Sequence, residues 1–353
     1  MSENYLQKYN WLKNFYPGYF AMTMATGIIS VAFLLHNSLL LSTIFMAITL
    51  VTWFAMTFIY TWRLIKYPKV VLDNLINPKT TFIFFTFVAA TNICGILLHQ
   101  RGFITLAITC WFIAFSYWAA LMYFSFTALC FAHKDREVNI MHGGWLILIV
   151  GTQSLVLLGT KIAGDFGQYA SYMMVEIHML WALGIIFYAV LVTLFCYRIF
   201  FKTMGVNDYS PLMWVIMGAA AISANAGSSL LLTDPVIPML AELHAVVQLI
   251  SIMLWTWATW WIPLLVMIGL WTHGYKKVPL KYNPAQWSII FPLGMYTVAT
   301  NNLALSSQFT PLLFLASGML WVAGISWSLL MFFFFKNIFT KMKENEQTIS
   351  TNE

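Results

Sequence analysis

Ten apolar runs, each long enough to cross a lipid bilayer as a helix, are the feature that most limits what this chain can fold into. A helical span needs about 20 mostly apolar residues. The runs do not alternate between apolar and polar positions, which excludes a membrane β-barrel. They cover residues 17–35, 39–62, 80–98, 103–131, 141–160, 170–197, 211–233, 239–271, 285–307 and 311–335. The sequence therefore predicts an all-α polytopic membrane protein.

The positions of the charges set the expected orientation in the membrane. Charged residues make up only 8% of the chain, and its net charge is +6. With ten spans, 16 of the 18 Lys and Arg fall on one side and only Arg101 and Lys161 on the other. The positive-inside rule places that basic side, with both termini, in the cytoplasm. The basic excess thus reflects topology in a cell (plasma or inner) membrane, and we expect no nucleic-acid partner.

Little of the chain lies outside the spans. We expect a cytoplasmic N-terminal tail at 1–16, a ten-helix transmembrane domain at 17–337 and a cytoplasmic C-terminal tail at 338–353. The first residues lack the pattern of a cleaved signal peptide. The charged end "KMKENEQTISTNE" is predicted to be disordered. Four cysteines inside the spans lack metal-ligand spacing and are interpreted as small buried apolar residues: Cys94, Cys110, Cys130 and Cys196.

The spans repeat in pairs. Every odd-numbered span has an aromatic residue near its start, four times shortly after a proline and once after His142-Gly-Gly. These aromatic residues are Phe20, Phe82, Trp145, Trp214 and Trp287, at intervals of 62, 63, 69 and 73 residues. This spacing predicts five helical hairpins in one orientation, arranged as a ring. An exporter of two inverted halves would show two repeats instead of five.

Odd spans are rich in small and polar residues, whereas even spans are bulkier and more apolar. Polar side chains in hydrocarbon need partners or water, so the odd spans are expected to face inward around a central path. The alternative is that hydroxyl and small residues mediate helix packing. The predicted pore-lining residues are Thr23, Thr26, Ser30, Thr86, Asn92, Thr152, Gln153, Ser223, Asn225, Thr297 and Asn301.

The chemistry of this path favours an anion. Five helix N-termini and the basic loops make the cytoplasmic mouth positive. A cation path would ordinarily contain rings of Asp or Glu, and the cores of the odd spans contain none. In the ninth span, Pro292 is expected to kink the helix beside Phe291, which would occlude the path as a hydrophobic gate or pack against neighbouring helices.

Two Glu-x-His pairs lie near the outer ends of even spans. Glu176 with His178 and Glu242 with His244 would serve as a proton relay, or would anchor helices at the outer interface. Neither pair has zinc-site spacing. A membrane enzyme is a remote alternative because the sequence shows no clustered ligands or nucleophile with a base. We therefore expect no metal and no cofactor.

The segment "FYPGYFAMTMATGIIS" and the motif "WSIIFPLG" resemble the tellurite-resistance/dicarboxylate transporter family, which includes the bacterial protein TehA, plant slow-type anion channels and fungal malate permeases. The resemblance covers about residues 16–337; Ala25 stands where many members have Gly. It implies five hairpins around a pseudo-fivefold pore, a homotrimer, anion transport and a gating phenylalanine at Phe291. Channel and proton-coupled dicarboxylate carrier both remain open, as does the identity of the anion.

Overall fold

The computed structural model describes residues 10–132 and 140–350, and this part of the chain is all-helical. Ten long helices account for most of it. They are α3 (Phe20–Leu35), α4 (Leu39–Lys66), α6 (Phe85–His99), α7 (Ile104–Phe131), α8 (Ile147–Ile162), α9 (Ala170–Phe201), α10 (Val215–Leu231), α12 (His244–Leu270), α13 (Trp287–Ser306) and α14 (Leu312–Ser350). The short helix α2 (Asn10–Lys13) precedes the first long helix, and α5 (Pro68–Ile76) and α11 (Pro238–Glu242) lie in connections between long helices.

Each of the ten apolar runs is helical in the structure. Seven helical segments meet the length and hydropathy expected of a membrane span, and one of these, Gly143–Phe201, joins two of the runs. The helix Phe20–Leu35 is apolar but shorter. The structure is therefore that of a helical membrane protein, as predicted.

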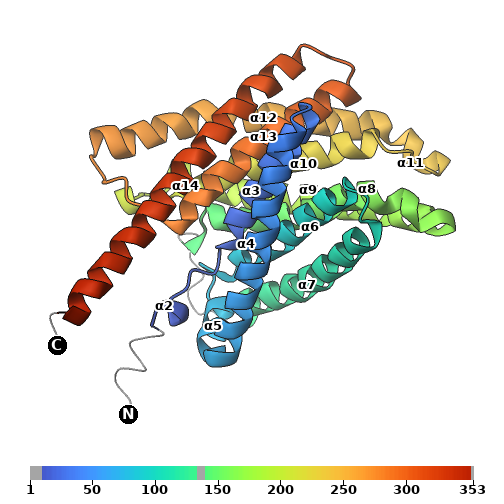
Figure 1. Cartoon of the computed structure of the whole chain (residues 1–353). Coiled ribbons are helices and arrows are strands. Elements are labelled where there is room, and N and C mark those ends of the chain that lie inside the picture. Colours follow the sequence, from blue (N-terminus) through green and yellow to red (C-terminus); the bar gives the residue numbers. More distant parts are fainter. Residues whose placement is uncertain (1–9, 133–139, 351–353) are drawn as a thin grey trace.

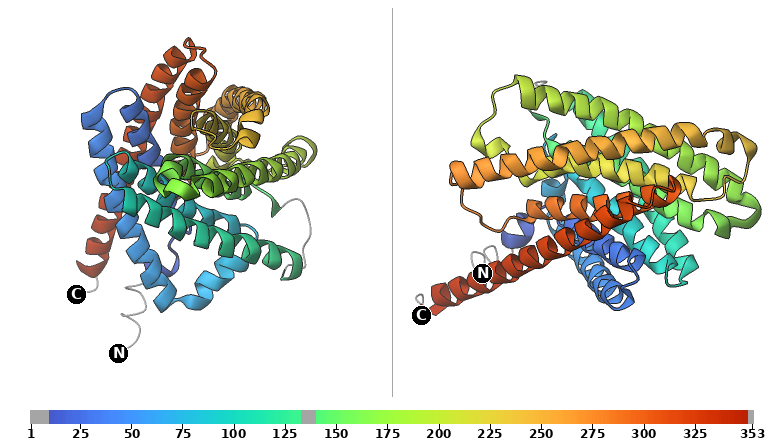
Figure 2. Two further views of the ribbon diagram at one scale, coloured as in Figure 1. Left: turned by 90° about the vertical axis from the view of Figure 1, so that its right-hand side faces the viewer. Right: turned by 90° about the horizontal axis from the view of Figure 1, so that it is seen from above.

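The helices contact one another in a regular order. Each of α3, α6, α8, α10 and α13 packs against the long helix that follows it in the chain. The same five helices, which we call the inner helices, also contact each other in sequence, and α13 contacts α3. The first hairpin (blue) accordingly lies beside the last (red), so that the two ends of the chain close a ring (Figures 1 and 2).

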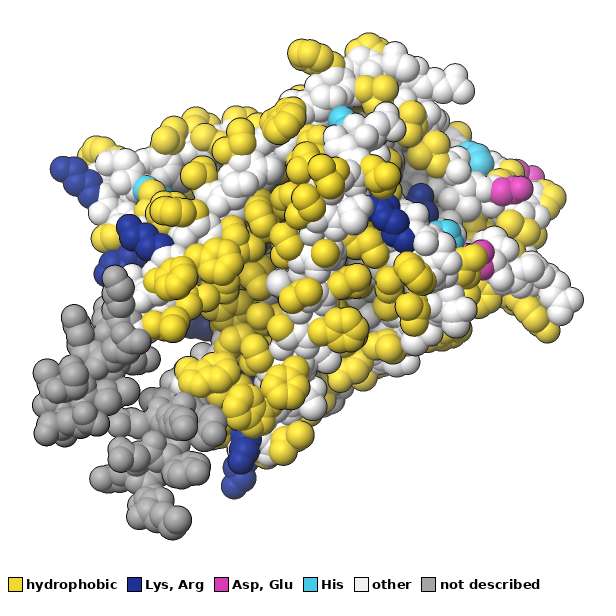
Figure 3. Space-filling model, in the orientation of Figure 1, with side chains coloured by type: hydrophobic (Ala, Val, Ile, Leu, Met, Phe, Trp, Pro, Cys, Tyr) yellow, Lys and Arg dark blue, Asp and Glu magenta, His cyan; other side chains and the backbone are white. Residues whose placement is uncertain are grey.

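Inner and outer helices differ sharply in burial. In the segment Thr81–His99, which contains inner helix α6, 83% of the most apolar window is buried, against 22% for outer helix α7. The outer helices α4, α7, α9, α12 and α14 expose large apolar side chains such as Phe58, Tyr123 and Phe332. Figure 3 shows such side chains covering the middle of one face, with Asp and Glu at the end away from the termini. This surface fits a lipid environment.

Short 3₁₀ turns start four of the inner helices. The turn Thr81–Phe84 precedes α6, Gly143–Leu146 precedes α8, Pro211–Trp214 precedes α10 and Pro284–Gln286 precedes α13. Where the other hairpins use proline, His142 caps the turn before α8: its Nδ1 accepts a hydrogen bond of 3.0 Å from the Gly144 amide. A Cβ at Gly143 would lie 2.0 Å from the Leu212 carbonyl oxygen, so glycine is needed there.

Two sequence predictions were wrong. The segment expected to be a disordered tail is helical over 341–350 as the last turns of α14, because it is rich in Lys, Glu and Gln, which favour helices. Cys130 lies on an exposed face of α7, whereas Cys94 is buried. A position inside an apolar span therefore does not imply burial within the protein, because the outer helices turn one face away from it.

Candidate functional site

Five tryptophans tie the ring together through one repeated contact. Each lies on an outer helix and donates its indole N–H to the inner helix of the following hairpin, and the last returns to the first hairpin. The bonds run from Trp53 to Thr91 Oγ1 (3.0 Å), Trp118 to Thr152 Oγ1 (2.8 Å), Trp181 to the Ser223 carbonyl (3.1 Å), Trp255 to Thr300 Oγ1 (2.9 Å) and Trp327 to Thr26 Oγ1 (2.9 Å). The five acceptors mark one position on each inner helix, which we call the indole level.

These bonds account for part of the predicted polar stripe. On α3, Thr26 accepts from Trp327 of α14, and Thr23 donates to Thr52 of α4 at 3.2 Å. Ser30 donates to the Ser42 carbonyl of α4 at 2.6 Å. The polar atoms of these three residues therefore contact outer helices. A packing role, which is the alternative that the sequence left open, would use such contacts, and the lining of a central path by these residues stays a prediction.

Two residues of α8 behave in the same way. Thr152 accepts from Trp118, and Gln153 donates to the Trp181 carbonyl at 3.2 Å. The side-chain oxygen of Gln153 has no hydrogen-bond partner in the described structure, although it is buried. Three further predicted residues donate to carbonyls of their own segment: Thr86 to Ile83, Ser223 to Ala219 and Thr297 to Leu293.

A group of amides joins α10 to α13 beyond the indole level. Asn302 donates to Asn225 Oδ1 at 2.8 Å, and Asn301 donates to Asn302 Oδ1 at 3.5 Å. One turn along α10, the hydroxyl of Ser228 is fully buried and has no hydrogen-bond partner in the described structure. We call Asn225, Ser228, Asn301 and Asn302 the amide cluster. It offers N–H and O–H donors and carries no formal charge.

Helix geometry turns two members of this cluster away from the indole contacts of their helices. Asn225 and Asn302 each lie two residues beyond the indole level of their helix, as does Ser154 on α8. Two residues turn a helix by about 200°, so these side chains leave the helix opposite the indole contact. Asn92, one residue beyond that level on α6, donates to Ser154 Oγ at 2.9 Å, and its buried Oδ1 has no partner among the described residues.

Phe291 and Pro292 lie deep in the ring. Phe291 is 1% exposed, and α13 continues without interruption across Pro292. A Cβ placed at Gly218 of α10 would lie 2.7 Å from Pro292 Cγ. Only a residue without a side chain therefore lets α10 approach α13 this closely.

Of the two Glu-x-His pairs, the structure brings the histidines near each other. His178 of α9 is buried, and its Nδ1 donates to the Met174 carbonyl at 2.7 Å. His244 of α12 lies within electrostatic range of His178. Glu242 is exposed and Glu176 half-buried. Among the described residues no group of three or more His, Cys, Asp or Glu is placed to hold a metal ion.

The repeated tryptophans were not anticipated. Their spacing was a usable signal, because positions 53, 118, 181, 255 and 327 follow one another at intervals of 65, 63, 74 and 72 residues. These intervals match those of the aromatic residues that start the odd spans.

Comparison with known proteins adds a family. The family model SLAC1, described as "Voltage-dependent anion channel", matches residues 14–335. Two proteins of Methanocaldococcus jannaschii, the uncharacterized transporters MJ0762 and MJ0576, are each 22% identical; the matches cover 90% and 91% of this chain and 93% of each relative. The uncharacterized membrane protein Rv1735c of Mycobacterium tuberculosis is 35% identical over 123 residues, which are 35% of this chain and 61% of that protein.

Proposed function

This chain belongs to the SLAC1 family of voltage-dependent anion channels, and we propose on that basis that it conducts small anions across a cell membrane along the axis of its ring. The observation that carries the proposal is the closed ring of five inner helices, held by five equivalent indole contacts. Five similar units arranged around one axis all contribute to the walls of a path along that axis. The substrates we consider are inorganic anions and dicarboxylates such as malate.

The proposed arrangement has ten spans in five hairpins, which form one transmembrane domain over 17–337. The basic residues at the ends of α4 and α9 and at the start of α5 support a cytoplasmic location for both termini. Assembly as a homotrimer stays a prediction from the family resemblance.

The chemistry of the inner helices supports an anion over a cation. The five inner helices contain no Asp or Glu. Within them the amide cluster supplies N–H donors, and Ser228 has a buried hydroxyl without a partner in the described structure. Such neutral donors replace part of an anion's hydration shell and still let the ion leave. Because the unpartnered buried oxygens of Asn92 and Gln153 are acceptors, the preference for an anion rests mainly on the absence of carboxylates.

Phe291 is the gate of this proposal, with Pro292 as its support. The phenyl ring is buried within the ring of inner helices, and Pro292 packs against Gly218 on the neighbouring helix. A large apolar side chain at such a position blocks an ion by excluding water.

The test is anion flux into liposomes that contain the purified protein. We expect Phe291→Ala to raise the flux of chloride and nitrate severalfold. Phe195→Ala is the matched control, because Phe195 is also 1% exposed but lies on outer helix α9. Equal flux in both variants, each folded as judged by thermal melting, would refute the assignment of Phe291 as the gate. Absence of any anion flux in the parent and in Phe291→Ala would refute the proposal of a channel.

A proton-coupled dicarboxylate carrier is the second candidate function. It is favoured by the approach of His178 to His244 between α9 and α12, near Glu176 and Glu242 in the chain. Malate uptake that requires a pH gradient, and that loses this requirement in Glu176→Gln or Glu242→Gln, would support it. Flux that simply follows each anion's own gradient would reject it.

A further inference from the structure

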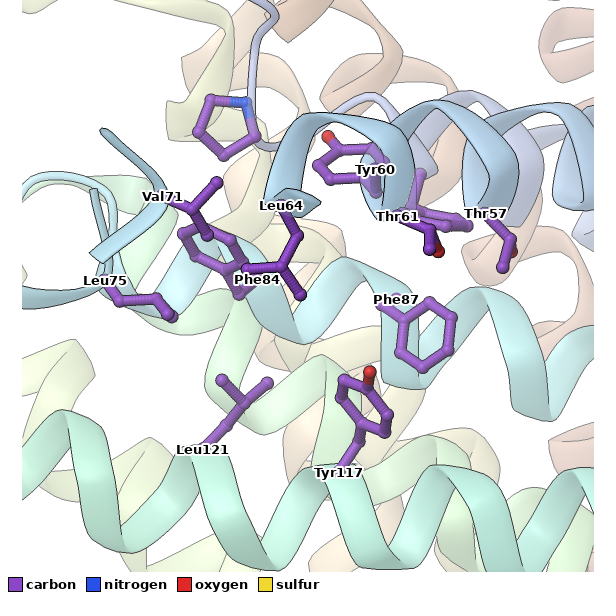
Figure 4. Close-up of a pocket in the computed structure, with 12 residues that line it drawn as sticks. Thr57, Tyr60, Thr61, Leu64, Val71, Leu75, Phe84, Phe87, Tyr117 and Leu121 are labelled. Carbon is purple, nitrogen blue, oxygen red and sulfur yellow. The ribbon is translucent and has the colours of Figure 1, made fainter. Parts of the chain in front are cut away.

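A lateral pocket opens between the first two hairpins, outside the ring. Its volume is about 210 Å³, and its walls come from α4, α5, α6 and α7. Figure 4 shows Leu64, Val71, Phe84, Phe87 and Leu121 around it. The pocket is mostly apolar, and the hydroxyl of Tyr60 in its wall is already used, because it donates to the Tyr16 carbonyl at 2.7 Å. It is thus suited to a hydrocarbon chain rather than to the transported anion.

The pocket runs along the membrane normal in the proposed orientation. Val71 and Leu75 of α5 line one end, whereas Thr57, Phe87 and Tyr117 line the other (Figure 4). On α4 the residues that line the pocket run from Leu64 back to Thr57. Seven residues of helix rise about 10 Å, which lies within one leaflet's half of a hydrocarbon core about 30 Å thick. A lipid tail that descends from the cytoplasmic interface would follow this course.

Two lysines lie close in the chain to residues that line the pocket: Lys66 follows Leu64 by two residues, and Lys69 precedes Val71 by two. Helix α5 buries Val71 toward the protein and exposes Lys69 and Asp73, as expected of a short helix lying at the interface. Lys66, at the end of α4, is also exposed and lies three residues before Lys69. With Asp73 as the opposing charge on α5, the three side chains keep a net positive charge, which attracts anionic lipid headgroups.

We propose that the lateral pocket binds one acyl chain of an anionic phospholipid from the cytoplasmic leaflet, with its headgroup over Lys66 and Lys69. The proposal rests on the membrane orientation given above and not on which anion is transported. Its consequence reaches the ring, because Pro17 and Phe20 at the start of inner helix α3 also line the pocket. Phe20 stacks on Tyr60 of α4 with ring centroids 5.1 Å apart. The bound tail therefore packs against the cytoplasmic end of an inner helix.

The test counts lipid by native mass spectrometry of the protein released from nanodiscs of equal phosphatidylglycerol and phosphatidylcholine. We expect one retained phosphatidylglycerol per chain in the parent. Leu64→Trp, which fills the mouth, should lower retention of phosphatidylglycerol about tenfold. Leu121→Trp should have the same effect and replaces the first variant if that one does not fold. Leu329→Trp is the control, because Leu329 is 56% exposed on α14 and Leu64 is 52% exposed on α4. Replacing Lys66 and Lys69 by Gln together should lower the preference for phosphatidylglycerol about tenfold.

Retention in Leu64→Trp and Leu121→Trp equal to that in Leu329→Trp would overturn the pocket as the site. Equal retention of the two lipids by the parent, unchanged in the double Gln variant, would overturn the headgroup assignment. Because the readout is bound lipid and not ion flux, failure of the channel proposal would leave this result standing.

Discussion

His142 should make the folded protein less stable as the solution becomes acidic. The sequence predicted the fifth span from residue 141, but in the structure the membrane-length segment begins at Gly143, so His142 lies just before it. Its Nδ1 accepts from the Gly144 amide at 3.0 Å, so Nε2 carries the proton and donates to the Lys79 carbonyl at 2.8 Å. Burial lowers the pKa of His142 to about 4, and the nearby charges of Arg198 and Lys79 act in the same direction. The bond from Gly144 is lost when Nδ1 is protonated, because both groups would then be donors.

The sign and size follow from proton linkage. In the unfolded chain the pKa of His142 is about 6.5, so between pH 6.5 and pH 4 the unfolded chain binds a proton that the folded protein does not. The stabilisation is therefore complete above pH 6.5 and is lost as the pH falls toward 4. At pH 5 the loss is about 2 kcal/mol, and it reaches at most about 3 kcal/mol, because part of the ring stays accessible.

The assay is thermal melting of the purified protein in detergent from pH 8 to pH 4.5, for the parent and for His142→Gln. Glutamine can accept and donate but does not titrate in this range. We expect the melting temperature of the parent to fall by several degrees more than that of the variant between pH 7 and pH 5. Other titrating groups contribute equally to both proteins and cancel in the difference. Identical pH profiles would refute the reasoning.

Three further predictions follow from other contacts. The indole bond from Trp327 to Thr26 should show a coupling of about 0.5–1 kcal/mol in a double-mutant cycle of Trp327→Phe and Thr26→Val, measured by reversible unfolding; zero coupling would remove its structural role. Gly218→Ala should destabilise the protein by about 1–3 kcal/mol through the contact with Pro292, whereas Gly318→Ala, which meets nothing within 4 Å, should not; equal melting temperatures would contradict this. Asn302→Leu removes a donor of the amide cluster and should lower anion flux in liposomes, measured beside the folded parent protein; unchanged flux would contradict a role of the cluster in conduction.

The sequence predicted the helices and their repeat but not the direction of side chains. Apolar runs of membrane length and the spacing of the hairpins depend on composition along the chain, which a single sequence contains. The direction of a hydroxyl depends on its neighbour across the helix interface. Thr26 and Asn225 are both polar residues on fully packed helices, yet one is bonded to an outer tryptophan and the other to an inner asparagine. Their sequence contexts do not distinguish them.

The tryptophan partner of each threonine at the indole level lies at least 34 residues away in the chain. Trp327 is 301 residues from Thr26, and only closure of the ring brings them together. The tryptophan repeat on the even spans predicts acceptors such as Thr26 and Thr152 on the odd spans, because an indole N–H within the membrane needs an acceptor.

The two sides of each inner helix have different degrees of symmetry, and this difference indicates where the function lies. On the outward side all five units repeat the indole contact. Two residues further along each inner helix the units diverge: Ile28 and Ile93 are apolar, whereas Ser154, Asn225 and Asn302 are polar. A contact that every unit needs for packing stays the same, while a path that holds one anion at a time needs donors on only part of its wall. The polar side between α8, α10 and α13 is therefore where substitutions should change which anion passes, whereas changes at the indole level should alter stability.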